Sequence, residues 1–315
     1  MLPPRSLVGA LKPLGDRGID LIAAVRGDEA SDVPELLRAC DGEGVRCGLW
    51  PMLDDAEGRW PSRANVARFS EYASRLLDRV PSSVAPPDLA FDLEPPIGLV
   101  SRVFSARRAG SGPLGDAWGP VAWGDAVSRF EALAGRVRAA GAEAFAAVVP
   151  MCLYDPERET GGWQRAMGTP VDDVGWDRAT VMLYTSIFEG WSRGALSRDD
   201  ARYLLVDGCR RARARFGPRG GVSLGAVGTG ALGDEPTYRG PDELADDVAL
   251  CAAEGIDDIT LFDYAGVLRR GSAEAWLDAL TGSPRPARVP LASRRVRALL
   301  AAASMTGRIG ARRRG

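Results

Sequence analysis

Short apolar segments alternate with longer amphipathic segments along most of this chain, and that alternation restricts the fold more than any other feature. Apolar, β-branched runs of strand length occur at 18–26, 45–53, 88–95, 143–151, 178–185, 221–229 and 257–265. Segments with helical periodicity occur at 32–43, 62–79, 123–140, 198–216, 241–254 and 272–281. Strict β–α alternation indicates a parallel sheet, so we predict an α/β fold of the (β/α)8 TIM-barrel type.

The links between these segments differ in length. Links from helix to strand are brief, whereas those from strand to helix are long at 52–62, 95–122, 150–176 and 184–198. In a barrel the long links all lie at the C-terminal ends of the strands, where enzymes of this fold place their active sites. The segment before residue 18 has a helical pattern. We therefore expect the first strand to be irregular, or truncated because the true start lies upstream.

Composition excludes several kinds of chemistry. The chain has no histidine, which removes Ser/His/Asp and Cys/His nucleophile systems and His-ligated metal sites. Lys12 is the single lysine, so a Schiff-base mechanism has one weak candidate. The 5 cysteines are scattered without a CxxC pair, and we interpret them as reduced residues of the core or of helix faces. Carboxylates, tyrosines, arginines or thiols must carry any chemistry, and no cofactor is expected.

The character of the chain changes near residue 283. Residues 1–282 are predicted to form the barrel domain, with a net charge near −11, and residues 283–315 a tail with nine arginines and no acid. We interpret this tail as solvated, with a short amphipathic helix at about 290–303, or as a contact for an acidic surface such as a membrane, nucleic acid or partner protein. Nucleic acid is not expected as the main partner, and no transmembrane segment is expected.

The N-terminal segment lacks the apolar region of a signal peptide. As written, the chain is predicted to be cytoplasmic. Secretion becomes the expectation if the N-terminus is incomplete.

The most informative strand is DLAFDLEP at 88–95. Leu89, Phe91 and Leu93 share one face, because alternate residues of a strand point the same way. If this apolar face meets the surrounding helices, Asp92 and Glu94 point into the barrel near its upper rim, with Cβ atoms roughly 6–7 Å apart. Two carboxylates so close disfavour double ionisation and tend to retain one proton, as a general acid requires. The alternative is a structural role, in which Asp92 and Glu94 pair with lumen arginines or cap loops. Asp88 is interpreted as a strand-start residue.

FDLEPP at 91–96, MLYT at 182–185 and LFDY at 261–264 occur in an order that resembles the family-18 glycoside hydrolases, the chitinase-like barrels, and their uncharacterised relatives. In that family an acidic motif ending DxE closes the fourth strand, M-x-Y the sixth, and an aromatic position the eighth. The resemblance spans most of residues 18–280. It implies a retaining hydrolase acting on a glycan such as an N-acetylated one, whose own 2-acetamido oxygen serves as the nucleophile.

Carried over residue by residue, the resemblance implies three catalytic roles. Glu94 resembles the proton donor and general acid/base, Asp92 the carboxylate that orients the acetamido group, and Tyr184 the hydroxyl that steadies it. Some positions depart from the family pattern. Ala90 stands where the family has an aspartate, Thr185 where it has Asp or Asn, and the last strand offers Phe262 and Tyr264 where tryptophan is usual.

Other residues near the predicted strand ends are candidates for sugar binding, because sugars stack on aromatic rings and hydrogen-bond to polar groups. The predicted substrate-binding residues are Trp50, Trp60, Trp163, Trp191, Tyr264 and Asp263, and Trp118 lies in a loop of the same kind. Trp276 lies in a helix and is predicted to be core. If no acetamido group participates, a second carboxylate is needed; the candidates are Asp54, Asp55, Asp155, Glu189 and Asp263. The glycine-rich GAVGTG at 225–230 is interpreted as a barrel-end turn, since it lacks the spacing of a phosphate loop.

Two alternatives to hydrolysis stay open. A barrel that binds carbohydrate or a cell-wall partner without turnover would tolerate the departures at Ala90 and Thr185. A phosphodiesterase or lyase using a divalent metal on Asp92 and Glu94 is the other alternative, and it is weakened by the lack of histidine.

Overall fold

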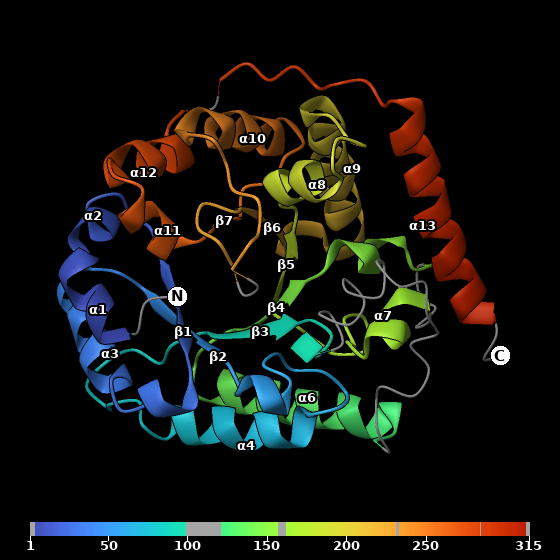
Figure 1. The fold of residues 1–315 in the computed structure, drawn as a ribbon. Coiled ribbons are helices and arrows are strands. Elements are labelled where there is room, and N and C mark those ends of the chain that lie inside the picture. Colours follow the sequence, from blue (N-terminus) through green and yellow to red (C-terminus); the bar gives the residue numbers. More distant parts are fainter. Residues whose placement is uncertain (1–3, 99–120, 157–161, 231–232, 284, 313–315) are drawn as a thin grey trace. The chain divides into compact units, whose positions relative to one another are not determined.

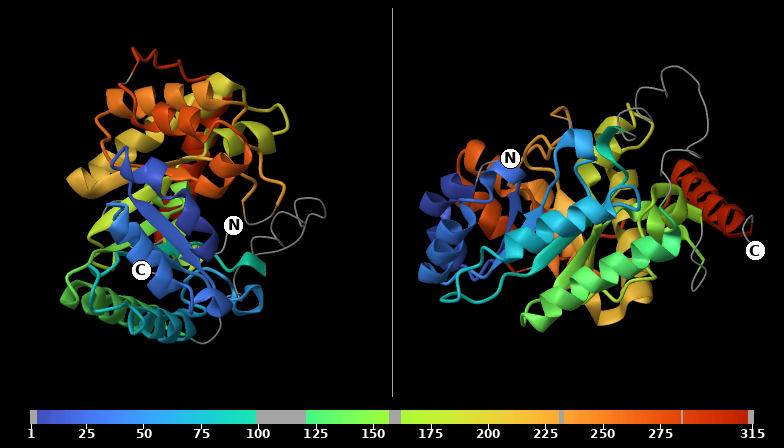
Figure 2. Two further views of the ribbon diagram at one scale, coloured as in Figure 1. Left: turned by 90° about the vertical axis from the view of Figure 1, so that its left-hand side faces the viewer. Right: turned by 90° about the horizontal axis from the view of Figure 1, so that it is seen from below.

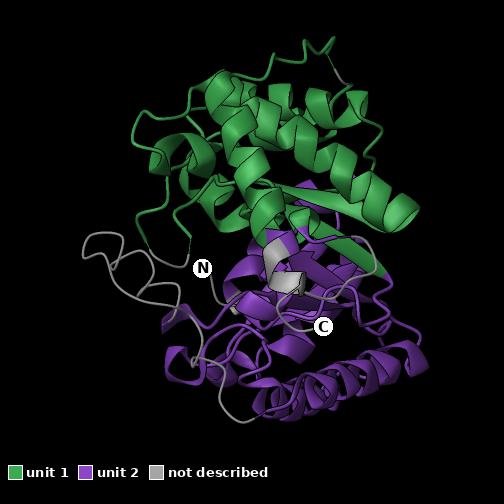
Figure 3. Ribbon diagram, turned by 90° about the vertical axis from the view of Figure 1, so that its right-hand side faces the viewer, with its two compact units in different colours: residues 1, 149–154, 178–306 green, residues 2–148, 155–177, 307–315 purple. Residues whose placement is uncertain are grey.

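The computed structural model describes residues 4–98, 121–156, 162–230, 233–283 and 285–312 (Figure 1). It has an α/β fold in which the strands of the described residues, β1 to β7, follow one another in chain order in one sheet, as in a TIM barrel with one strand fewer. The chain divides into two compact units, coloured separately in Figure 3. Unit 1 comprises residues 1, 149–154 and 178–306, and unit 2 comprises residues 2–148, 155–177 and 307–315.

Unit 2 holds the first four strands and their helices. Its elements are α1 (Pro4–Leu7), α2 (Lys12–Gly15), β1 (Leu21–Val25), α3 (Val33–Gly42), β2 (Cys47–Pro51), α4 (Val66–Leu77), β3 (Leu89–Leu93), α6 (Trp123–Ala139), β4 (Ala144–Val148) and α7 (Gly162–Met167). Neighbouring strands are parallel, as the predicted crossover connections require. Helices α4 and α6 lie side by side in both views of Figure 2 and cover one side of β2 to β4. This side is called the helix-facing side below.

Unit 1 holds the remaining strands. Its elements are β5 (Arg178–Met182), α8 (Thr185–Trp191), α9 (Arg198–Phe216), β6 (Gly220–Gly225), α10 (Pro241–Ala253), β7 (Ile259–Phe262), α11 (Tyr264–Arg269) and α12 (Ala273–Thr281). Helix α13 (Arg294–Arg312) begins in this unit, and the boundary between the units falls within it. β5, β6 and β7 are again parallel.

Every predicted strand and each of the main predicted helices contains an element of the structure. In α9 the bounds also agree, because the Ser197 hydroxyl accepts from the Asp200 N–H while the Asp200 carboxylate accepts from the Ser197 N–H, which is a capping box. The C-terminal helix was expected at about 290–303 and begins at Arg294 instead, where the Ser293 hydroxyl accepts from the N–H of Val296. No strand precedes β1 in the part of the chain that the structure describes.

The cores lie between the strands and the helices. In unit 2, Phe91 of β3 packs against Phe69 of α4, Phe130 of α6 and Trp176, with ring centroids 4.7–6.3 Å apart. In unit 1, Val181, Leu183, Val222 and Leu224 join a cluster with α9, α10 and the predicted core residue Trp276, which is 3% exposed. All 5 cysteines are free and buried, as predicted. None of the described helices is long and apolar enough to span a bilayer.

Candidate active site

Strand β3 orients the predicted carboxylate pair. Phe91, Leu89 and Leu93 are fully buried on the side that faces α4 and α6, which confirms the predicted apolar face. Asp92 therefore lies on the opposite side of the strand, here called the inner face, and its backbone is in register with Ala147 of β4. Glu94 follows directly after the strand, and its N–H donates to the carbonyl oxygen of Asp92 at 2.9 Å.

Small side chains share the inner face with Asp92. The register of β1, β2 and β3 places Ala24, Trp50 and Ala90 on this face, since Ala24 pairs with Trp50 and Leu49 pairs with Leu89. Ala24, Trp50 and Ala147 are half-buried rather than fully covered. Trp50, one of the predicted substrate-binding residues, thus lies on the same face as the carboxylate pair. Its neighbours on this face are alanines, whose side chains are small.

Asp92 is buried, although one of its carboxylate oxygens has no hydrogen-bond partner among the described residues. Its side chain is 3% exposed, and within the described residues its Oδ1 has no hydrogen-bond partner. Ala90, the preceding residue of the inner face, has no polar side-chain atom to offer. A structural carboxylate buried in this way is normally paired, because an unsatisfied buried acceptor costs about 1–3 kcal/mol. The predicted alternative of an arginine partner for Asp92 is not seen in the described part of the chain.

Burial raises the pKa of Asp92 well above its ordinary value, and the charge of Glu94 and a side-chain hydrogen bond to it raise the pKa further. Glu94 is half-buried, so it is the more exposed member of the pair. The raised pKa of Asp92 favours a proton on the buried member, beside the more accessible carboxyl group.

The inner face of unit 1 carries the predicted tyrosine. Tyr184 follows β5, and its ring stacks on Phe262 at the end of β7, with centroids 5.5 Å apart and planes inclined by 16°. The Ser223 hydroxyl donates to the Tyr184 oxygen at 3.2 Å. Gly225 of β6 is in close contact with both residues: a Cβ atom there would be 2.6 Å from the Phe262 carbonyl oxygen and 3.2 Å from Tyr184 Cδ1. A larger residue at this position would require Phe262 to shift.

Thr185, next to this tyrosine, points away from the inner face. It is fully buried, accepts from Arg198 Nη1 at 2.7 Å and donates to the carboxylate of Asp247. Tyr238 donates to the same carboxylate at 2.8 Å, and Arg198 Nη2 lies 3.0 Å from it. The network ties α8, α9 and α10 together. Thr185 is therefore a structural link between helices.

Several predicted residues have other contacts. Asp263 caps α11, accepting from the N–H groups of Gly266 and Gly228 at 3.0 Å, and the latter lies in the predicted glycine-rich turn. Tyr264 begins α11 and packs against the helix-facing core of unit 1. Phe262, which was not among the predicted binding residues, occupies the inner face instead. Its alternation with the apolar Leu261 was the sequence signal that could have identified it.

The predicted tryptophans differ in exposure. Trp60 is 5% exposed and packs within unit 2, beneath the guanidinium of Arg59. Trp163 is half-buried at the start of α7, and Trp191 is 36% exposed at the end of α8. Trp118 lies outside the described residues.

The remaining acids are mostly engaged in the framework. Asp88 pairs with Arg46 at 2.9 Å and accepts from the N–H of Glu143, as expected of a strand-start residue. Asp155 accepts from the N–H groups of Trp163 and Gln164 and holds α7. The other predicted second carboxylates are Asp55, which pairs with Arg59, Glu189, which pairs with Arg239, and the exposed Asp54. No group of three or more Cys, Asp or Glu side chains suited to a metal ion occurs among the described residues.

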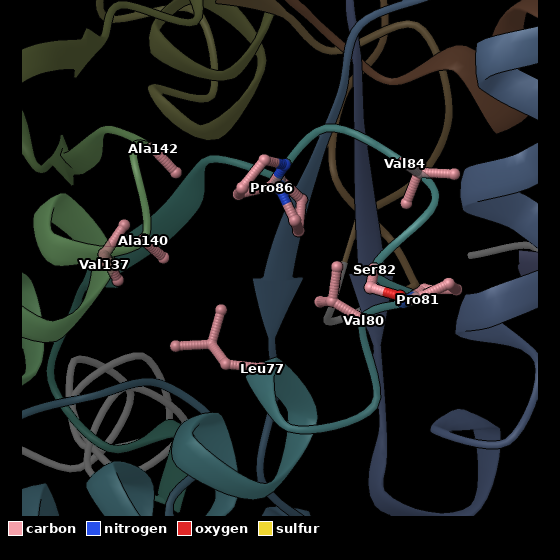
Figure 4. Close-up of a pocket in the computed structure, with 10 residues that line it drawn as sticks. Leu77, Val80, Pro81, Ser82, Val84, Pro86, Val137, Ala140 and Ala142 are labelled. Atoms are coloured by element: carbon pink, nitrogen blue, oxygen red, sulfur yellow. The ribbon is translucent and has the colours of Figure 1, made fainter.

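The structure thus brings Asp92 together with Glu94 in unit 2, and Tyr184 with Phe262 and Ser223 in unit 1. A pocket of about 300 Å³ in unit 2 is separate from the carboxylate pair (Figure 4). It lies at the N-terminal ends of the strands, between the C-terminal ends of α4 and α6 and the segment before β3. Its lining is mostly apolar: Leu77, Val80, Pro81, Ser82, Val84, Pro86, Pro87, Val137, Ala140 and Ala142.

The fold is similar to those of carbohydrate-active enzymes. The PgaB (BpsB) glycoside hydrolase domain from Bordetella bronchiseptica has 11% identity and a TM-score of 0.56, covering 89% of this chain and 94% of that one. A GH18 chitinase from Pseudoalteromonas aurantia has 12% identity and a TM-score of 0.50, covering 87% and 97%. At such identities these likenesses show the fold alone. No family model and no curated protein matches the sequence.

Proposed function

We propose that this chain is a retaining glycoside hydrolase in which Glu94 is the general acid/base and Asp92 the assisting carboxylate. The observation that carries the proposal is the buried pair itself: Asp92 is 3% exposed, its Oδ1 has no hydrogen-bond partner among the described residues, and it lies beside the more accessible Glu94. A purely structural role leaves the unsatisfied Asp92 Oδ1 unexplained. A ligand group that donates to this oxygen accounts for it.

The pair can supply a proton and take it back. In the first step the proton held by Asp92 crosses the hydrogen bond to Glu94, and Glu94 delivers it to the glycosidic oxygen as the bond to C1 breaks. In the second step the Glu94 carboxylate accepts a proton from water. The water oxygen bonds to C1 as the bond between C1 and the substrate's own acetamido oxygen, formed in the first step, breaks. Between the steps Asp92 is ionised, and its negative charge favours the positive charge that develops on the sugar.

The substrate class we propose is a glycan with a 2-acetamido sugar. Its carbonyl oxygen would attack C1 in place of an enzyme nucleophile, and its N–H would donate to Asp92 Oδ1. Tyr184 would hold the acetamido group through its hydroxyl, with the stacked Phe262 as an apolar platform for a sugar ring. Trp50 on the inner face of unit 2 is a further candidate platform.

Substitution of Glu94 by Gln tests the proposal. Gln keeps the shape but cannot transfer the proton, so turnover is expected to fall by at least about 100-fold while binding persists. The substrates are fluorogenic oligosaccharides of N-acetylglucosamine and their de-N-acetylated counterparts, assayed with and without EDTA. Glu71→Gln on the exposed face of α4 is the matched control and should retain wild-type turnover.

Each outcome of this assay is informative. Wild-type turnover by Glu94→Gln would contradict the assignment of the general acid. Equal cleavage of acetylated and de-N-acetylated substrates would contradict participation of the acetamido group and would direct attention to a second carboxylate. Loss of activity with EDTA would favour the metal-dependent alternative.

Binding of a glycan without turnover is the second candidate function. The observation that favours it is Thr185, which is fully buried in the network with Asp247 and so supplies no polar group beside Tyr184. Under this alternative no oligosaccharide is cleaved by the wild-type chain, although some of them raise its melting temperature.

A further inference from the structure

The loop between β2 and α4, residues 52–65, lies in unit 2 at the same ends of the strands as the carboxylate pair. Two of its residues, Gly58 and Arg59, have φ angles in the left-handed region, of 103° and 63°. Arg59 carries a side chain, which makes this conformation costly, and a costly conformation persists only where the surrounding structure fixes it. The loop is therefore expected to be held firmly in place.

Hydrogen bonds within the loop supply this support. The Asp55 carboxylate accepts from Arg59 Nε at 2.7 Å and from Arg59 Nη2 at 2.9 Å, which is a bidentate pair. The side-chain Nδ2 of Asn65 donates to the carbonyl oxygens of Glu57 and Trp60, each at 2.9 Å. These contacts fix the loop on both sides of residue 58.

Gly58 contacts the segment that follows Glu94. Its carbonyl oxygen accepts from the N–H of Ile97 at 3.2 Å. A Cβ atom at this position would lie 3.3 Å from Pro96 Cβ and 2.8 Å from Asn65 Nδ2. A larger residue would therefore have to displace Pro96, the Asn65 amide or both. The loop and the segment after Glu94 meet at this glycine.

The backbone of Glu94 is thus held from both directions along the chain. Before it, Leu93 is fully buried in β3. After it, Pro95 and Pro96 restrict the backbone, and Ile97, which is 8% exposed, is bonded to the loop. A displacement of about 1 Å in a catalytic group can reduce a rate on the order of 100-fold. The contacts of the loop with this segment therefore bear on proton transfer by Glu94.

We propose that the loop of residues 52–65 positions the Glu94 carboxyl group, and that it acts through Gly58. The inference rests on the proposed function and adds a positioning residue to the same site. It also gives a role to Asp55 and Trp60, which were candidates for chemistry and for sugar binding: the Asp55 carboxylate and the Trp60 carbonyl hold the loop. A change at Gly58 should lower kcat more than it raises KM, because it moves the proton donor rather than a ring that binds sugar.

Gly58→Ala tests the proposal on the fluorogenic oligosaccharides. The added Cβ atom moves Pro96 and with it Glu94, so we expect kcat to fall about 10-fold with KM changed less than about twofold. Gly44→Ala is the matched control, because Gly44 also has a left-handed φ, of 67°, but has open space around the added Cβ atom among the described residues. It should keep the wild-type kcat. Equal losses in the two variants would contradict the proposal.

A double-mutant cycle shows whether the effect passes through Glu94. In the Glu94→Gln background the displaced side chain no longer transfers a proton, so Gly58→Ala should change the residual turnover by less than about twofold. A loss of about 10-fold in this background as well would overturn the proposal, because Gly58 would then act independently of Glu94.

Asn65→Ala covers the case in which Gly58→Ala does not fold, as circular dichroism would show. This variant removes the two hydrogen bonds from Nδ2 and frees the loop without a new atom beside Pro96. The same loss of kcat at little-changed KM is expected, and a wild-type kcat would count against the positioning role.

A further readout does not require turnover. The charge of Glu94 and a hydrogen bond to it help to raise the pKa of Asp92. If Gly58→Ala displaces Glu94, the free energy of unfolding, measured in urea, should fall less above about pH 4 than it does for the wild type. Gly44→Ala should keep the wild-type profile. A wild-type profile for Gly58→Ala would overturn the positioning role, whereas a wild-type chain that cleaves no oligosaccharide would contradict the proposed function alone.

Discussion

Asp92 shows how a single carboxyl group connects the candidate chemistry to the stability of the fold. Burial and the neighbouring Glu94 raise its pKa, so the folded chain keeps a proton that the unfolded chain, with an ordinary aspartate pKa near about 3.9, has released. The contribution of Asp92 to the free energy of unfolding should therefore decrease as pH rises from about 4 through its raised pKa.

The variant Asp92→Asn tests this dependence, because asparagine keeps the shape of the protonated acid and does not titrate. We expect it to flatten the decrease in stability above about pH 4, as measured by urea unfolding at a series of pH values. Glu71→Gln should keep the wild-type slope. Parallel profiles for the wild type and Asp92→Asn would mean that Asp92 takes up no extra proton on folding.

At the scale of residues, the orientation of a side chain could be predicted from the sequence where the local pattern of apolar residues determines it. The location of Asp92 on the inner face followed from the alternation of Leu89, Phe91 and Leu93. These apolar residues share the other face of the strand and pack against helices. Tyr264 was different. The apolar pattern does not show that Asp263 turns its carboxylate back to cap α11. The strand therefore ends at Phe262, three residues before the predicted end at 265.

At the scale of elements, the contacts that join α8, α9 and α10 depend on one buried carboxylate, that of Asp247. Asp247 of α10 is fully buried; burial raises its pKa, which Arg198 and the hydrogen bonds from Thr185 and Tyr238 oppose. Arg202 Nε also lies 3.5 Å from it. Removal of this carboxylate leaves two arginines without their shared partner.

We expect Asp247→Asn to lower the free energy of unfolding by about 3–5 kcal/mol, the usual cost of breaking a buried ion pair on one side. Asp246→Asn is the matched control, since Asp246 is the next residue of the same helix and also pairs with Arg202, but its side chain is 47% exposed. Its loss should cost about 0–1 kcal/mol. Urea unfolding measures both, and equal costs would show that the network does not act as a buried unit.

The bounds of α9 illustrate what an element's own sequence can determine. Its start and end were predictable because Ser197 and Asp200 form a capping box and Gly217 follows the last turn with φ of 60°. The network around Asp247 was not predictable, because Thr185, Tyr238 and Asp247 are brought together by packing between elements and carry no shared local signal.

The alternation of strands and helices was sufficient, at the scale of the whole molecule, to predict an α/β barrel-type fold from the sequence. It could not predict the division into two compact units, because the alternation is the same on both sides of the boundary. The segment 155–177 joins the earlier residues of unit 2 through contacts such as Arg63 N–H to the Gly168 carbonyl at 2.7 Å. Contacts of this kind depend on the assembled fold.

Binding of a glycan should stabilise the whole chain. A ligand that binds only the folded state raises the free energy of unfolding by about 2.7 kcal/mol at a concentration of 100 times its Kd. We expect N-acetylated oligosaccharides to raise the melting temperature of Glu94→Gln by several degrees, measured by differential scanning fluorimetry, and de-N-acetylated ones to have less effect. An unchanged melting temperature across the panel would contradict glycan binding at this site.

The lack of histidine has a practical consequence for the buried proton of Asp92. Between about pH 5 and 8 an ordinary protein releases protons from its imidazoles, and their titration hides that of a displaced carboxyl group. This chain has no imidazole. Potentiometric titration across that range can therefore compare the protons released by the wild type and by Asp92→Asn without a background of histidine titration.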